Sequence, residues 1–438
     1  MADDLGVGDL SIYGQKKFST PNIDSIGAAG MKFTSAYAGC TVCAPSRSVL
    51  MTGKHMGHTS IRGNTGGQSL EPSDVTIAQL LKQAGYATGG FGKWGLGDLE
   101  TDGVPWKKGF DEFFGYLNQV HAHWFYPRFL MDNDKRYYLP GNVNGVRKTY
   151  SHDVIAEKAL SFIERHHQRP FFCYVPFTIP HWELLAPETS MKKYRGKFEE
   201  MAMIGNGHYA DQEIAHAAYA AMIDRMDADV GRILQTLERL GVADNTLVIF
   251  TSDNGAAMRL YKGDDYFRST AGLRGHKQNV YEGGIRTPML ARWPGHIKPG
   301  STSDLQTYFA DVMPTLCEVA GVKPAAGIDG HSIVPTLTGQ GAQPQHEYLY
   351  WELPRYNGRT ETFFAETPMQ AARAGNWKIV RPQPNAPTEL YDLAADPFEE
   401  SNLAAERPAE LKRMEAILAK ARVAPRPLKN PSRAYWDE

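Results

Sequence analysis

Two amphipathic helical segments, each followed by an apolar segment and then by polar residues, constrain the fold of this chain more than any other feature. The first helix is predicted around residues 155–164, and an apolar strand follows at 171–177. The second helix is predicted from about 214 to 240, and a second apolar strand follows at 246–251. This alternation predicts an α/β fold with a large, mostly parallel central sheet flanked by helices.

Polar residues directly follow both predicted strands. His181 comes after the strand at 171–177, and Ser252-Asp253-Asn254-Gly255 comes after the strand at 246–251. In open α/β sheets, ligands bind at the carboxyl ends of the strands. We therefore expect a ligand site where these two strands end.

The pattern of the chain changes after about residue 330. Shorter β-like segments occur at 348–353 and 377–380, and a charged helix is predicted at 408–423. A chain of 438 residues also exceeds the usual size of a single hydrophobic core. We therefore predict a large α/β domain over residues 1–330 and a smaller α+β subdomain, with an antiparallel sheet, over residues 331–438.

Composition excludes several classes of protein. The 47 basic and 49 acidic residues nearly cancel, which argues against a nucleic-acid partner. No apolar run reaches the roughly 20 residues of a spanning helix, so we expect no membrane span. The start, Met1-Ala2-Asp3-Asp4-Leu5-Gly6, carries no signal peptide, which fits either a cytoplasmic protein or one with a processed leader. No hydrophobic strand precedes Asp3 and Asp4, so we expect this acidic pair to be held loosely.

Cys43 begins the most specific motif, Cys43-Ala44-Pro45-Ser46-Arg47, which continues to Thr52-Gly53. Cys40 and Cys43 also form a C-x-x-C pattern, which would suit a redox pair or a zinc site. No second cysteine pair is present to complete a zinc site, and Pro45 and Arg47 are not explained by redox chemistry. A structural role would be the default for Cys43 alone, but its context favours a chemical one.

Cations and oxygen ligands occur in further motifs. Lys93 lies in the glycine-rich segment 85–97, where an ammonium group can approach an anion closely. Lys277 precedes the turn Tyr281-Glu282-Gly283-Gly284. Carboxylates and an amide are the ligands that hard cations prefer. Asp3, Asp4, Asp253 and Asn254 carry oxygen atoms of this kind.

In order and spacing these motifs resemble the type I, formylglycine-dependent sulfatases of the alkaline-phosphatase-like superfamily, in their arylsulfatase and carbohydrate sulfatase branch. The resemblance extends from Asp3 to Leu403 and implies an alkaline-phosphatase-like sandwich. It implies that a formylglycine-generating maturation enzyme converts Cys43, and that the four oxygen ligands hold Ca²⁺, with Mg²⁺ as the alternative. It further implies a catalytic set of Cys43, Arg47, Lys93, His181 and Lys277, in which His181 or Lys277 protonates the leaving oxygen.

One position departs from the family pattern. Many relatives carry a histidine, expected to contact the sulfate or the nucleophile, where this chain has Gly95. His121 or His123 is the candidate replacement, and a surface or substrate-subsite role is the alternative. With Trp124, these histidines could contact a sugar, although an ordinary aromatic packing cluster explains the same residues equally well.

The resemblance favours a sulfated carbohydrate over a simple aryl sulfate as substrate, and a periplasmic or secreted location. A phosphate mono- or diester or phosphonate hydrolase of the same superfamily is the main rival, because the formylglycine motif also occurs there. An inactive sugar-binding homologue is a further alternative. The oligomeric state and the identity of the sugar are not encoded in any pattern that we recognise.

Overall fold

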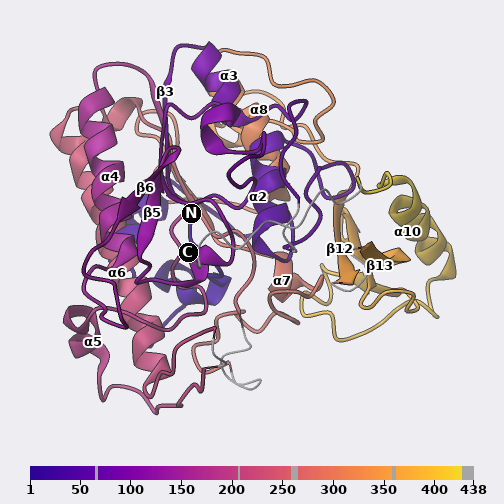
Figure 1. Cartoon of the computed structure of the whole chain (residues 1–438). Helices are drawn as coiled ribbons and strands as arrows, with labels where there is room; N and C mark the ends of the chain where they lie inside the picture. The colour runs from indigo at the N-terminus through magenta and orange to yellow at the C-terminus, as the bar shows by residue number, and fades with distance from the viewer. Residues whose placement is uncertain (65–67, 206–207, 258–264, 358–361, 427–438) are drawn as a thin grey trace.

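The computed structural model describes residues 1–64, 68–205, 208–257, 265–357 and 362–426 (Figure 1). One five-stranded sheet has the strand order β6–β5–β4–β3–β7. Its strands, in that order, are Lys135–Tyr138, Phe129–Asp132, Glu112–Tyr116, Ala87–Lys93 and Phe171–Tyr174. Strand β3 pairs in parallel with β4 and β7, whereas β5 and β6 add to the edge in antiparallel fashion.

A second sheet has the order β10–β1–β9–β8. Its strands, in that order, are Ser301–Ser303, Met31–Phe33, Met289–Arg292 and Val248–Thr251. Strand β1 is parallel to β10, and β9 is antiparallel to both β1 and β8. Strands β2 (Ala36–Tyr37) and β11 (Thr307–Tyr308) form a separate parallel pair, which Tyr37 bridges to Arg286 just before β9.

Residues 1–3 connect the two sheets by lying between the ends of β7 and β8. On one side, Phe177 N donates to Met1 O at 3.0 Å and Asp3 N donates to Ile179 O at 3.3 Å. On the other, Ala2 N donates to Thr251 O at 2.8 Å, and Ala2 forms a parallel bridge with Ser252. The expectation of a loosely held acidic pair was therefore wrong, because this segment itself pairs with both neighbours.

Helices cover the sheets on two faces. On one face α4 (Ser151–His166) and α6 (Ala215–Arg239) pack side by side, together with α1 (Pro21–Ala28) and α5 (Glu188–Tyr194) (Figure 1). On the other face lie α2 (Cys43–Thr52), α3 (Ile77–Gln83) and α8 (Val312–Val319). Successive strand residues point to opposite faces, so Phe113 and Phe114 of β4 enter different hydrophobic cores.

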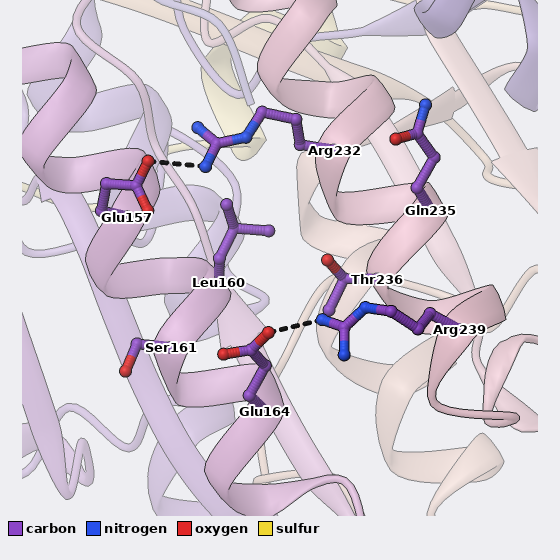
Figure 2. A pocket seen from close by; sticks show the side chains of 8 residues that line it. All are labelled: Glu157, Leu160, Ser161, Glu164, Arg232, Gln235, Thr236 and Arg239. Atoms are coloured by element: carbon purple, nitrogen blue, oxygen red, sulfur yellow. Dashed lines mark hydrogen bonds and ion pairs between the residues drawn. The ribbon is translucent and has the colours of Figure 1, made fainter.

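The outer surfaces of α4 and α6 are joined by ion pairs across a charged groove of about 500 Å³ (Figure 2). Arg232 pairs with Glu157 at 2.6 Å, and Arg239 pairs with Glu164 at 2.5 Å. The apolar faces of both helices, including Ile155, point inward as the helical periodicity predicted.

The C-terminal part contains an antiparallel sheet of order β12–β13–β14–β15, with α10 (Pro408–Lys420) packed on it (Figure 1). Its strands, in that order, are Leu349–Asn357, Thr362–Ala374, Trp377–Arg381 and Glu389–Asp392. This sheet shares a hydrophobic core with α2, α3 and α8. Two short helices lie in connecting segments: α7 (Glu282–Ile285) before β9, and α9 (Val334–Thr338) before β12.

The predicted α/β class with a smaller antiparallel subdomain is confirmed, and its sheets are mixed. Parallel pairs join β3 to β4 and β7, β1 to β10, and β2 to β11. The domain boundary at residue 330 stays a prediction. Within the described parts of the chain, no helix is both long and apolar enough to cross a membrane.

Candidate active site

The site lies where several elements end or begin. Strand β3 ends at Lys93, and Asp253 and Asn254 directly follow β8. His181 follows the extension of β7, and α2 begins at Cys43. The carboxyl ends of neighbouring parallel strands therefore meet the amino end of a helix, an arrangement that suits binding of an anion.

Asp3 and Asp253 hold two buried cations. Lys93 Nζ lies 2.7 Å from Asp3 Oδ2. Arg47 donates to Asp253 Oδ2 from Nε at 3.0 Å and from Nη2 at 2.7 Å, and its Nη2 lies 3.6 Å from Asp3. All four side chains are fully buried. The two pairs thus form one connected network beneath Cys43.

Asp4 is the centre of a second set of contacts. Lys277 Nζ lies 2.7 Å from its carboxylate, and Asn254 Nδ2 donates to Asp4 Oδ1 at 2.8 Å. His181 Nε2 lies 3.5 Å from Asp4 Oδ2. Asp4 itself has a positive φ of 67°, a strained conformation that commonly marks functional sites.

Burial and neighbouring charges both shift the pKa values in this cluster. Burial raises the pKa of Asp253, and the neighbouring Asp3 raises it further. Burial alone would lower the pKa of Lys277, but Asp4 outweighs it and the pKa is raised. When all six groups are ionised, three negative and three positive charges cancel. These groups are Asp3, Asp4, Asp253, Arg47, Lys93 and Lys277.

The oxygen donors fit a hard cation. Asn254 Oδ1 is buried and has no hydrogen-bond partner among the described residues, although its Nδ2 is bonded. An unpaired buried carbonyl oxygen is costly, and a bound cation would remove that cost. Candidate ligand atoms of Asp3, Asp4, Cys43 and His181 all lie within 4.8 Å of one another. Two of the four predicted ligands, Asp3 and Asp4, belong to this group. The other two are joined to Asp4, because Asp4 N donates to Asp253 Oδ1 at 3.1 Å and Asn254 Nδ2 donates to Asp4 Oδ1.

Cys43 lies at the first position of α2 and is fully buried. Its Sγ is 3.4 Å from Asp3 Oδ1 and 3.5 Å from Lys277 Nζ. Burial, reinforced by Asp3, raises the pKa of the Cys43 thiol to about 12. The unmodified thiol is therefore protonated at neutral pH and is a poor nucleophile.

Cys40 does not pair with Cys43. Both are free, and Cys40 Sγ contacts Glu352 O at 3.5 Å rather than the other thiol. Burial raises the pKa of Cys40 to about 12 as well. A redox pair needs an accessible thiolate, so the C-x-x-C pattern has no support as a redox site here.

The two candidate replacement histidines occupy different environments. His121 is buried beside Tyr116 and Phe129, and burial lowers its pKa to about 3. His123 instead stacks on His181, with ring centroids 4.4 Å apart. Only His123 therefore reaches the site, and His121 has a packing role.

His123 is held by two residues that no sequence motif indicated. Its Nδ1 lies 3.0 Å from Tyr209 Oη and 2.9 Å from His208 Nε2. Trp124 joins the same group, because its Nε1 donates to His208 O at 3.1 Å. Burial, and then Lys93 and Lys277, lower the pKa of His123 well below its usual value. Its environment is thus that of a neutral imidazole.

Two family profiles match the chain. The profile described as Sulfatase matches residues 1–322. The profile described as N-sulphoglucosamine sulphohydrolase, C-terminal, matches residues 275–423. Together they cover the site and the C-terminal sheet.

Individual proteins are similar over most of the chain. Human arylsulfatase A is 31% identical over 456 residues, which cover 92% of this chain and 82% of that protein. The solved structure of Ps i-CgsB with k-i-k-neocarrahexaose has a TM-score of 0.78 at 27% identity, covering 96% of this chain and 91% of that one. A phosphonate monoester hydrolase of Agrobacterium radiobacter shares the fold, with a TM-score of 0.72 at 24% identity over 95% of this chain and 94% of that one.

Proposed function

Because the chain belongs to the sulfatase family, and is therefore a hydrolase of sulfuric esters, we propose that it cleaves a sulfate monoester on a carbohydrate. The observation that carries this proposal is the convergence of three cations and four oxygen ligands around Cys43. We further propose that a maturation enzyme converts Cys43 to formylglycine, and that the protein acts in the periplasm or outside the cell.

Two groups would supply chemistry that the unmodified chain lacks. As a hydrated aldehyde, residue 43 would supply one hydroxyl as the nucleophile. It would also supply a second hydroxyl, whose deprotonation re-forms the carbonyl as the C–O bond to the sulfate breaks. Ca²⁺, held by Asp3, Asp4, Asp253 and Asn254, supplies positive charge beside the sulfate oxygens.

The remaining side chains stabilise and orient the anion. The six ionised groups cancel one another, so a bound divalent cation would leave the pocket positive and suited to a sulfate ester. Arg47 and Lys93 are fixed by buried ion pairs, so little reorganisation is needed as charge develops. We assign Lys277 to the same role, next to residue 43.

His181 is the proposed donor of a proton to the leaving oxygen, with Lys277 as the alternative. Burial, and then Lys277, lower the pKa of His181, so the imidazolium is a strong acid when it forms. Its Nδ1 is buried and has no partner among the described residues, so we assign the donated proton to this nitrogen. General acid catalysis of this kind contributes roughly 10²–10⁴-fold.

The aromatic cluster beside His181 could bind a sugar. Trp182 stacks on Tyr209 with centroids 5.0 Å apart, and His123 and Trp124 lie in the same cluster. Aromatic faces next to hydrogen-bonding groups are a common arrangement for carbohydrate recognition. The similarity to Ps i-CgsB, whose structure holds an oligosaccharide, supports a sulfated glycan as substrate here.

The first experiment measures turnover of a chromogenic aryl sulfate and of sulfated oligosaccharides. We expect activity in the wild type, loss of activity in Cys43→Ala, and no loss in the control Cys317→Ala, a free cysteine in α8. The peptide that contains Cys43 should be about 18 Da lighter after conversion. An unshifted peptide mass in an active protein would contradict the formylglycine proposal.

The shared fold of the phosphonate monoester hydrolase keeps one rival open. Matched aryl sulfate, phosphate monoester, phosphate diester and phosphonate substrates separate the two functions. We expect the highest kcat/KM for the sulfate. A preference for the phosphonate or phosphodiester would overturn the proposed substrate, and binding of sulfated sugar with no turnover would indicate the inactive homologue.

A further inference from the structure

Gln119 has a buried side-chain amide that makes no hydrogen bond to any described residue. Its Nε2 and its Oε1 are both buried, and neither has a hydrogen-bond partner among the described residues. A buried amide is normally paired, because leaving either atom unpaired carries a desolvation penalty. The orphaned amide therefore points to a ligand that pairs with it.

The amide occupies the space in front of Gly95. A Cβ atom placed on Gly95 would lie 1.8 Å from Gln119 Nε2 and 2.7 Å from its Cδ. Gly95 also has a positive φ of 76°, which side chains rarely adopt. The backbone and Gln119 together exclude a side chain at position 95, and the Gln119 amide takes the position where such a side chain would begin.

This position lies close to the anion site along the chain. Gly95 follows Lys93 by two residues, and Lys93 holds Asp3 next to Cys43. The intervening Trp94 turns away, because its Nε1 donates to Gly103 O at 2.8 Å. Gly95 N donates to Leu117 O at 2.9 Å, which fixes the loop of Gln119 at the end of β3.

The rest of that loop also faces the cations. His123, four residues after Gln119, stacks on His181. Lys93 and Lys277 add to burial in lowering the pKa of His123, so both ammonium groups lie close to this loop. An amide N–H beside these cations complements an anionic oxygen without adding charge.

We propose that Gln119 donates a hydrogen bond from Nε2 to a sulfate oxygen of the substrate. The proposal rests on the proposed sulfatase function, and it assigns to this chain a neutral donor that does not titrate.

The test compares Gln119→Met and Gln119→Glu with wild type. Methionine fills the same space without a donor, and glutamate places a negative charge there. A hydrogen bond to an anion typically contributes roughly 10- to 100-fold in affinity. We expect Gln119→Met to bind inorganic sulfate about 10- to 100-fold more weakly by calorimetry, and Gln119→Glu to bind it more weakly still.

A second readout separates this role from packing. Removing an orphaned amide should leave the Tm of the ligand-free Gln119→Met protein unchanged or higher, while its KM for an aryl sulfate rises. The matched control is Gln235→Met, the same substitution at an exposed position of α6, which should change neither sulfate affinity nor KM.

Unchanged sulfate affinity in Gln119→Met would overturn the proposal. If that variant does not fold, Gln119→Asn replaces it, because it withdraws the amide by one methylene, and unchanged affinity there has the same meaning. The proposed function fails separately, when the wild type itself does not hydrolyse aryl sulfates. An active wild type with an unaffected Gln119→Met therefore rejects only the role of Gln119.

Discussion

His55 is a buried histidine whose protonation bears on stability. Its Nδ1 accepts a hydrogen bond from Gly57 N at 3.0 Å, so in the neutral ring Nε2 carries the hydrogen. Nε2 points toward Asp329 Oδ1 at 3.7 Å, and the ring stacks on His58. Burial lowers the pKa of His55 to about 4, although Asp329 opposes this shift.

The lowered pKa makes folding sensitive to acid. In the unfolded chain the pKa is near 6.5, so between about pH 4 and 6.5 the unfolded state binds more protons. Stability therefore rises with pH across this window and is lost as the pH falls. Between pH 7 and pH 5 we expect His55 to account for about 2 kcal/mol of lost unfolding free energy. Urea denaturation at both pH values, with wild type and His55→Asn, measures it; equal losses in the two proteins would contradict this assignment.

Single residues also show which side-chain positions the sequence patterns could not predict. His121 and His123 looked equivalent as candidates, but both lie in the short 3-10 helix His121–His123. With three residues per turn, positions two apart point in different directions, so one side chain enters the core and the other the site. Tyr209 and Gln119 belong to no motif, and their roles depend on how two loops fold back onto β3 and β7.

At the scale of elements, the C-terminal sheet supports the loop that carries Lys277. Lys378 of β14 pairs with Glu282 at 2.9 Å and with Glu399 at 2.8 Å, and all three are fully buried. Glu282 N also donates to Glu399 Oε2 at 2.7 Å. Glu282 begins α7, five residues after Lys277, so this ion cluster anchors one end of the active-site loop.

Removing the central cation should therefore affect both stability and catalysis. Lys378→Met leaves the buried Glu399 without its cation, whereas Glu282 keeps Arg286 at 2.9 Å. Breaking a buried pair in this way costs about 3–5 kcal/mol. We expect that loss of unfolding free energy in urea, together with a lower kcat for an aryl sulfate. Lys420→Met removes an exposed pair with Glu347 and should change neither value. Comparable stability of Lys378→Met and wild type would show that the cluster does not anchor the loop.

Helices and strands with a strong hydrophobic period were predictable from the sequence. Very short segments, and pairings between strands far apart in the chain, were not. Helix α6 was expected at about 214–240 and runs over Ala215–Arg239, because its apolar face repeats for many turns. Segment 1–3 is too short to show a period, and its pairing depends on β7 and β8, which lie far along the chain. The antiparallel insertion of β9 between β1 and β8 likewise has no local signal.

At the scale of the whole molecule, the proposed cation site lies at the junction of the two sheets. Asp3 ends the segment of residues 1–3 that joins β7 to β8, Asp4 follows it, and Asp253 and Asn254 continue from β8. Asp253 and Asn254 were recognisable in sequence because they follow a predicted strand, at whose carboxyl end ligands bind. Asp3 and Asp4 were recognised only through the resemblance to the sulfatases. The position of all four at the junction of the two sheets was not predictable, because it depends on contacts between residues about 250 positions apart.

A cation bound at this junction should stabilise the entire fold, because unfolding separates its ligands. At a free Ca²⁺ concentration of 100 times Kd, the expected gain is about 2.7 kcal/mol. Thermal unfolding of chelator-treated protein, with and without added Ca²⁺, measures the gain independently of Cys43 conversion, and parallel titration with Mg²⁺ distinguishes the two ions. Asn254→Ala should remove most of the gain, whereas Asn245→Ala, in the turn before β8, should retain it. The ion pairs to Lys93 and Lys277 already hold Asp3 and Asp4 in place, so we expect Ca²⁺ to raise the Tm without changing the secondary structure seen by circular dichroism. A Tm that is independent of Ca²⁺ would mean that these two ammonium groups alone neutralise the acidic residues.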